Sequence, residues 1–325
     1  MRSIFALSLL GAVSMAEETL SVEFEFMNFI AKYNKNYTNM EEYTARFANW
    51  KILDDVVKKV NAPGSGYTHT AGHNKGSDLH DHEFKKMLGH IENRDRTVYK
   101  VHETIPANRM EMDWRTENGG ACVQTIKDQA SCGSCWAFSS CATLESSFCL
   151  DGNPLYSFSE QQLVDCSGPW GNGDCENGGF YEYAFNYLKT NGMMTEAEYP
   201  YTATSPVDSC VQNKADFIAK TNSSIPYATV PNSEAPDSIY SAINLKPVNV
   251  AIQADNPVFR TLESGVLTSW ECGTAINHAI AAVGYNQDNG TEPYLIVRNS
   301  WGADWAENGY GKIGMTTGKG ICGIN

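Results

Sequence analysis

Apolar residues near the start of the chain recur every three or four positions. Between Leu20 and Val60 this spacing is interrupted by the Asn-rich turn NKNYTN at residues 34–39. The pattern predicts two amphipathic helices separated by a turn. A Gly- and His-rich connector at residues 62–81 leads to a further predicted helix at residues 82–88. This first segment is therefore expected to be an α-helical domain.

The composition of the sequence changes near residue 106, after which Gly, Asn, Cys and aromatic residues become frequent. A helix is predicted to begin near Cys135, because apolar residues follow at helical spacing up to Phe148. Short apolar segments bounded by turn residues, at 247–253, 278–285 and 293–301, predict strands. Helices followed by strands indicate an α+β fold with two lobes rather than a βαβ sheet.

The first sixteen residues are typical of a secretory signal peptide: Arg2, an apolar run, and small residues spaced for cleavage. Nothing later is long and apolar enough to predict a membrane helix. Three Asn-x-Ser/Thr acceptor sites, at Asn36, Asn222 and Asn289, agree with a secretory route.

The protein is acidic, with a formal net charge of -14 and a pI near 4.9. Phosphate-rich partners would be repelled, so neither nucleic acid nor an anionic membrane is an expected partner. Together with the signal peptide, the acidic composition predicts that the protein is located in a lysosome, a similar acidic vacuole or the extracellular space.

A C-x-x-C pair, Cys132 and Cys135, admits three interpretations: a redox dithiol, half of a zinc site, or one nucleophile at a helix start. Ten cysteines in an oxidising compartment favour disulfides. A dithiol lacks its βαβ context, and zinc lacks a second C-x-x-C pair, so neither metal nor cofactor is expected.

One histidine, His278, follows the boundary near residue 106, whereas the other six precede it. A lone histidine is more often structural than catalytic. The balance changes when a candidate nucleophile, Cys135, and an orienting amide, Asn299, are also present.

The Cys132–Trp136 run CGSCW, followed by a distant His278 and by Asn299-Ser300-Trp301, resembles the papain family of cysteine peptidases. Upstream, two cathepsin L-like propeptide motifs are similar to positions Glu42, Arg46, Trp50, Val57, Asn61, Gly72, Asn74 and Asp78. Leu53 stands where the first motif has Asn, and Gly76 where the second has Phe. The resemblance implies an inhibitory α-helical propeptide before a papain-like fold with a helical left lobe and a β-barrel-like right lobe.

By this resemblance the chain divides into a signal peptide (1–16), a propeptide (17–106) and a peptidase domain (107–325), with processing near residues 105–108. Met112-Asp113-Trp114-Arg115 is similar to the start of a mature domain.

The resemblance also implies a role for each motif residue. Cys135 would attack the scissile carbonyl as a thiolate paired with the His278 imidazolium. Asn299 would orient the imidazole, and Trp301 would shield that hydrogen bond. Gln129 and the backbone N–H of Cys135 would stabilise the oxyanion.

Three disulfides follow from the same resemblance: Cys132–Cys175, Cys166–Cys210 and Cys272–Cys322. Three cysteines remain, Cys122, Cys141 and Cys149, which allow at most one further bond. Cys141, inside a predicted helix, is expected to be a small buried apolar residue.

By the same resemblance, the substrate cleft is expected along Gly178, Gly179, Phe180 and Tyr181, and Ala251 and Ala279 are similar to other pocket walls of the family. The small alanine side chains imply a roomy pocket for the substrate residue two positions before the scissile bond, called the second pocket below, which would accept Leu, Val or Phe. The sequence ends before the residue that usually forms the pocket floor, and no His-containing insertion blocks the cleft, which favours endopeptidase action.

Three hypotheses follow: a zymogen of an acid-acting cysteine endopeptidase, a catalytically weak homologue that binds peptides, and a disulfide oxidoreductase. Expected partners of the first are peptide and protein substrates, its own propeptide and cystatin-like inhibitors, with the enzyme a monomer.

Overall fold

The computed structural model describes residues 21–91, 109–205, 210–213, 216–220, 228–230, 236–287 and 292–324. The predicted signal peptide, the processing region, Asn222 and Asn289 lie outside these residues, whereas Asn36 is described and exposed. No described helix is long and apolar enough to cross a membrane.

Residues 21–91 lie where the resemblance places the propeptide and are called the prosegment below; the part of the chain from residue 109 onward is called the peptidase domain on the same ground. The prosegment is built on two crossing helices. Residues 21–32 form the first, and α2 (Met40–Asn61) is the second, capped by the Asn39 side chain at Glu42 N–H. Phe26, Phe29 and Trp50 form an aromatic core between them. Both helices were predicted from the apolar spacing, and the turn between them lies where the Asn-rich run occurs.

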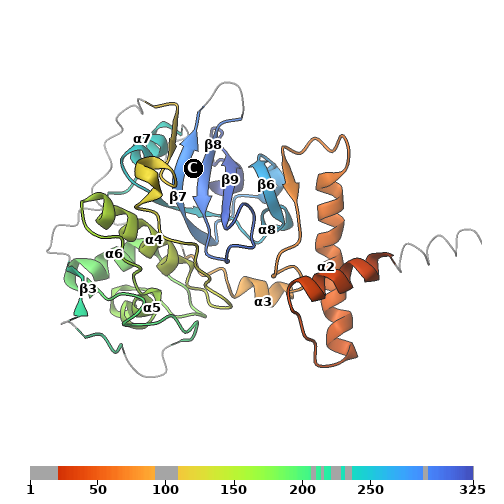
Figure 1. Cartoon of the computed structure of the whole chain (residues 1–325), viewed down its shortest axis with the longest axis horizontal. Helices are drawn as coiled ribbons and strands as arrows, with labels where there is room; N and C mark the ends of the chain where they lie inside the picture. The colour runs from red at the N-terminus through yellow and green to blue at the C-terminus, as the bar shows by residue number, and fades with distance from the viewer. Residues whose placement is uncertain are drawn as a thin grey trace, which may run out of the picture.

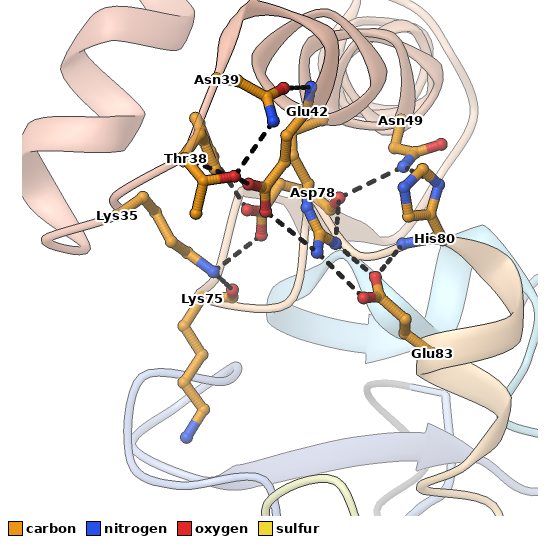
Figure 2. A network of polar contacts seen from close by, with 11 residues as sticks. Lys35, Thr38, Asn39, Glu42, Asn49, Lys75, Asp78, His80 and Glu83 are labelled. Carbon is orange, nitrogen blue, oxygen red and sulfur yellow. Dashed lines mark hydrogen bonds and ion pairs between the residues drawn. The ribbon is translucent and has the colours of Figure 1, made fainter.

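A polar network fixes the rest of the prosegment onto α2 (Figure 2). The buried carboxylate of Asp78 accepts hydrogen bonds from Lys35 at 2.7 Å and from the Tyr37 hydroxyl at 2.9 Å. Arg46 pairs through both terminal nitrogens with Glu83, the N3 residue of helix α3 (Asp81–Lys85). These contacts hold α3 at the edge of the prosegment that faces the peptidase domain.

Helix α3 is shorter than the predicted 82–88 helix. It ends at Lys85, and residues 86–88 continue in turns, with Met87 N–H bonded to Phe84 C=O and Leu88 N–H to Lys85 C=O. The chain then extends through Gly89 and His90, where it bonds to another segment instead of to its own helix. The apolar spacing at 82–88 therefore reflects contacts with the peptidase domain.

Helices form one lobe of the peptidase domain (Figure 1). Trp136, Leu163, Tyr187 and Met193 pack together in its core. Its elements are α4 (Cys135–Leu150), α5 (Glu160–Cys166), α6 (Tyr181–Thr190) and a short antiparallel pair of strands, β3 (Gly192–Met193) with β4 (Ala219–Lys220).

The second lobe is a seven-stranded sheet in the order β1-β6-β9-β8-β7-β2, with β5 also paired to β7. Three strands match the segments predicted from sequence: β5 and β8 lie within them, and β7 extends one residue beyond its segment. The strands are β1 (His69–Ala71), β2 (Glu111–Asp113), β5 (Val248–Ile252), β6 (Leu262–Leu267), β7 (His278–Asn286), β8 (Tyr294–Arg298) and β9 (Tyr310–Gly314); α7 (Asp237–Leu245) and α8 (Pro257–Arg260) accompany them.

The α+β, two-lobed prediction is confirmed, but the barrel-like description of the sheet lobe is wrong in detail. Among the described residues the sheet stays open, because neither β1 nor β2 has a partner that closes it. The β1 edge strand comes from the prosegment and pairs antiparallel with β6 (Figure 1). The prosegment therefore covers one open edge of the peptidase sheet, where unpaired backbone groups would otherwise face solvent.

Candidate active site

Cys135 is the first residue of α4 and is fully buried. The backbone N–H of Ala279, from β7, is directed at its sulfur at 3.5 Å. A thiol at a helix N-terminus lies in the positive field of the helix dipole, which favours the thiolate. The fold thus places this sulfur where the helical lobe meets the sheet lobe.

His278 is the first residue of β7 and is also fully buried. Its Nε2 atom lies 2.8 Å from Oδ1 of Asn299, which follows β8. Because Oδ1 can only accept, Nε2 carries the proton of the neutral ring and Nδ1 keeps a lone pair. Nδ1 has no hydrogen-bond partner among the described residues, so it can take a proton.

Trp301 covers this histidine–asparagine pair. Its ring stacks on His278 with centroids 4.8 Å apart, and both side chains are buried. Excluding water in this way strengthens the hydrogen bond that orients the imidazole.

Gln129 lies beside the same residues and is fully buried. Its Oε1 accepts a 2.6 Å hydrogen bond from the Ser300 hydroxyl, which fixes the orientation of the amide. Its Nε2 donates to the Cys132 carbonyl at 2.8 Å and to the prosegment carbonyl of Met87 at 2.9 Å. A prosegment carbonyl thus accepts from the amide nitrogen that sequence analysis assigned to the oxyanion.

The charged thiolate–imidazolium pair expected from sequence is not favoured in this prosegment-bound form. Burial raises the pKa of the Cys135 thiol to about 11, partly offset by backbone N–H groups directed at the sulfur. Burial also lowers the pKa of His278 to about 4, against the opposing hydrogen bond to Asn299. Both groups are therefore neutral near pH 7 while the prosegment covers them.

The prosegment crosses the site as an extended strand through Gly89 and His90. Gly89 C=O accepts from Gly179 N–H at 2.7 Å, and Ile91 N–H donates to Gly179 C=O at 3.0 Å, which makes a parallel bridge. The backbone N–H of Gly89 is directed at the Cys135 sulfur. The prosegment therefore occupies the nucleophile with a hydrogen bond.

Close backbone contact requires glycine on both sides of this crossing. A Cβ on Gly89 would lie 1.7 Å from the Gly133 carbonyl oxygen. Gly178 has φ +67°, and a Cβ there would lie 2.2 Å from the Gly89 carbonyl oxygen. The cleft wall at residues 178 and 179 thus lets a peptide backbone approach directly.

His90 fills the pocket beside this wall. Its ring lies 5.3 Å from that of Phe180 and 5.5 Å from that of Tyr181, and it is 8% exposed. Ala279 is buried and pairs in register with Ala251, which is half-buried. Sequence analysis counted His90 only as one of six prosegment histidines. The glycine that precedes it, after a predicted helix, was the one sequence feature that could have indicated a close backbone crossing at this point.

Four disulfides brace the two lobes. The structure contains the three pairs expected from the family resemblance, Cys132–Cys175, Cys166–Cys210 and Cys272–Cys322, and a fourth, Cys122–Cys149. Cys135 and Cys141 are free and buried. Because Cys132 is bonded to Cys175, the C-x-x-C pair is not a dithiol in this structure, which argues against an oxidoreductase.

Two family models match the chain. The model described as "Papain family cysteine protease" covers residues 109–325, and the "Cathepsin propeptide inhibitor domain" covers residues 26–84. These matches agree with the division into prosegment and two-lobed domain seen in the structure.

Similar proteins extend over nearly the whole chain. The thiol protease aleurain of Arabidopsis thaliana is 38% identical over 92% of this chain and 81% of its own length, and the cathepsin L-like proteinase of Fasciola hepatica is 36% identical over 90% and 88%. Among solved structures, a recombinant stem bromelain precursor has a TM-score of 0.80 at 31% identity, covering 94% of this chain and 96% of that one. Digestive procathepsin L 3 of Tenebrio molitor larval midgut has a TM-score of 0.80 at 30% identity, covering 93% and 96%. The chain belongs to the papain family of cysteine proteases and carries that family's cathepsin propeptide inhibitor domain.

Proposed function

We propose that this protein is the zymogen of a cysteine endopeptidase in which Cys135 is the nucleophile. The observation that carries the proposal is the 2.8 Å contact between His278 Nε2 and Asn299 Oδ1, which assigns the proton to Nε2 and leaves Nδ1 free beside the nucleophile's helix. Once the prosegment leaves, water reaches both groups, desolvation falls, and the thiolate–imidazolium pair becomes favourable.

The reaction then follows in two steps. The thiolate attacks the scissile carbonyl, and the imidazolium gives its proton to the leaving amine, which leaves an acyl-enzyme on Cys135. Water, deprotonated by His278, then hydrolyses the thioester. The Gln129 Nε2 and the backbone N–H of Cys135 stabilise the oxyanion of both tetrahedral intermediates. Asn299 and Trp301 act through His278 by fixing its ring.

Substrate binds along the wall that the prosegment occupies in the zymogen. Gly179 hydrogen-bonds the peptide backbone and Gly178 lets it approach closely, while Phe180, Tyr181, Ala251 and Ala279 line the second pocket. The rings around His90 support a pocket for a large apolar or aromatic side chain.

The prosegment is an intramolecular inhibitor, and its removal near residues 105–108 would free a peptidase domain of residues 107–325. Cleavage after residue 16 would remove the signal peptide. The protein would then follow the secretory route, along which the acceptor sites would be glycosylated, to an acidic vacuole or to the exterior. We expect the mature enzyme to be a monomer and to be inhibited by cystatin-like proteins that bind the vacated cleft.

The proposal is tested by expressing the full chain, acidifying it, and measuring hydrolysis of a fluorogenic peptide with Phe or Leu in the second position before the scissile bond. We expect hydrolysis to appear after acidification and to be absent in Cys135→Ala. Hydrolysis by Cys135→Ala within a few-fold of wild type would remove Cys135 from the mechanism. A folded wild type without hydrolysis would favour the peptide-binding alternative.

A further inference from the structure

Arg260, the last residue of α8, carries a buried positive charge that forms no ion pair among the described residues, although the carboxylates of Asp81 and Asp255 act on it at longer range. Its side chain is 9% exposed, its Nε has no hydrogen-bond partner, and no ion pair with a described carboxylate is formed. Burial lowers its pKa to about 10, so the guanidinium stays charged at neutral pH. Burying a cation without an ion pair is costly, so the charge is not explained by folding stability alone.

In the zymogen the prosegment covers this charge with an aromatic ring. The guanidinium carbon of Arg260 lies 3.9 Å from the ring centre of Phe84. Phe84 also meets Trp301 edge-on, with centroids 5.2 Å apart. The cation–π contact offsets part of the burial cost, and it ends when the prosegment is removed.

A cavity of about 290 Å³ adjoins Arg260. Its peptidase side includes Trp301 and Trp305, and its prosegment side includes Phe84, Met87 and Gly76. Gly76 is the position where the propeptide motif of the family has phenylalanine, so a smaller residue here leaves space next to the guanidinium. Without the prosegment, Arg260 and the two indoles become an open surface.

This surface lies on the leaving-group side of the scissile bond. His278, which protonates the leaving amine, stacks on Trp301. Met87 lines the cavity and also places its carbonyl on the Gln129 amide. The cavity therefore begins beside the oxyanion position, whereas the pocket of Phe180 and Tyr181 contacts His90, on the far side of Gly89.

We propose that Arg260 is a specificity residue that selects peptide bonds followed, within the first two residues of the leaving fragment, by a carboxylate. A guanidinium offers paired donors that match a carboxylate, and the flanking indoles reduce competition from water. Two carboxylates oppose this selection in part: Asp255, which acts on Arg260 at longer range, and Asp128, which borders the cavity. The Asp128 carboxylate is exposed and accepts a hydrogen bond from Ala130 N–H at 3.0 Å. The inference rests on the endopeptidase function proposed above.

The test uses the mature enzyme, processed from the full chain, and quenched peptides that differ only at the first or second leaving residue. The ratio of kcat/KM for Glu over Gln is measured at each position, and separately for peptides whose leaving dipeptide ends in a free carboxylate or an amide. We expect a ratio of about ten at one position, the size of one partly solvated charge-assisted hydrogen bond. The free-carboxylate arm shows whether a side chain or a chain end is the better source.

Arg260→Gln should bring the Glu/Gln ratio to about one, Arg260→Glu should favour Lys over Gln, and Asp128→Asn should raise the ratio. Arg115→Gln, at the opposite end of β7 and paired with Asp113, is the matched control that should keep the wild-type ratio. Because each ratio compares two peptides on one enzyme, a general loss of activity cancels. A wild-type ratio of one, or a ratio that persists in Arg260→Gln, would overturn the assignment of Arg260, whereas absence of any hydrolysis would instead refute the endopeptidase function.

Discussion

Replacing His90 by phenylalanine should remove a large part of the acid sensitivity of prosegment binding. His90 fills the second pocket as a neutral ring, and burial lowers its pKa from 6.5 to about 3, with His278 adding a smaller effect in the same direction. Tyr181, stacked on it, is neutral throughout the acid range because burial raises its pKa. A phenyl ring fits the same aromatic contacts and cannot be protonated.

The sign follows from linkage. The released prosegment binds a proton on His90 below pH 6.5, whereas the docked one does so only near pH 3. Docking is therefore unaffected by this group well above pH 6.5 and weakens as the pH falls from 6.5 towards 3. Since pH 5 lies about 1.5 units below the pKa of the released histidine, prosegment docking is weaker at pH 5 than at pH 7.5 by about 2 kcal/mol. This corresponds to about 30-fold in the docking equilibrium.

The assay is the rate at which an epoxide probe labels Cys135 in the intact zymogen, divided by the rate for the mature enzyme at the same pH. Between pH 7.5 and pH 5 this ratio should rise about 30-fold less in His90→Phe than in wild type. His82→Phe changes an exposed histidine of the same segment and should behave as wild type. A His90→Phe zymogen whose ratio rises as steeply as that of wild type would refute this explanation and direct attention to His69, whose pKa burial lowers to about 4.

Three further changes test separate parts of the structure. Gly89→Ala should displace the prosegment, because the new Cβ would lie 1.7 Å from a peptidase carbonyl oxygen. The rate at which the epoxide probe labels Cys135 in the zymogen at pH 7.5 should rise at least about tenfold. Gly168→Ala, where the new Cβ meets no atom within 4 Å, is the control and should leave this rate unchanged. His278→Ala should lower kcat by about a thousandfold or more and Asn299→Ala by about 10- to 100-fold, and steady-state kinetics showing the reverse order would contradict their roles. Ala306→Gly should stabilise the chain by about 0.5 to 1 kcal/mol in guanidinium unfolding, since Ala306 has φ +48°; an unchanged or lower midpoint would show that this strain is absent.

Local sequence signals sufficed where they coincide with local structure. The apolar spacing from Met40 to Asn61 gives a helix because one face of α2 packs on the aromatic core of the prosegment. The strands β7 and β8 were predicted because continuous apolar runs bounded by turns indicate strands buried on both faces.

Features that depend on contact between distant segments could not be predicted. The strand β1 has three residues, and its pairing with β6 arises from an edge of the sheet almost two hundred positions away. The bond between Cys122 and Cys149 follows from the path of α4, which brings Cys149 beside residue 121. The neutral state of Cys135 and His278 results from burial under the prosegment, which their own motifs do not encode.

The proposed role of Arg260 also depends on contact between distant segments, so it could not be predicted from the sequence. No motif surrounds it in the sequence, and its environment is formed by Phe84 from the prosegment and by Trp301 from the loop after β8. Only the folded chain brings an unpaired guanidinium next to the residues that act on the leaving amine.

The central claim, that Cys135 is a nucleophile held inactive by the prosegment, is tested most directly by counting covalent labels on the intact protein. The full chain is treated with an epoxide thiol probe at pH 7.5 and after acidification, and the labelled residue is identified by peptide mass mapping. The account predicts little labelling before acidification and one label per mature chain afterwards, on Cys135. Labelling on Cys141, or a folded and processed domain that takes up no label, would contradict it.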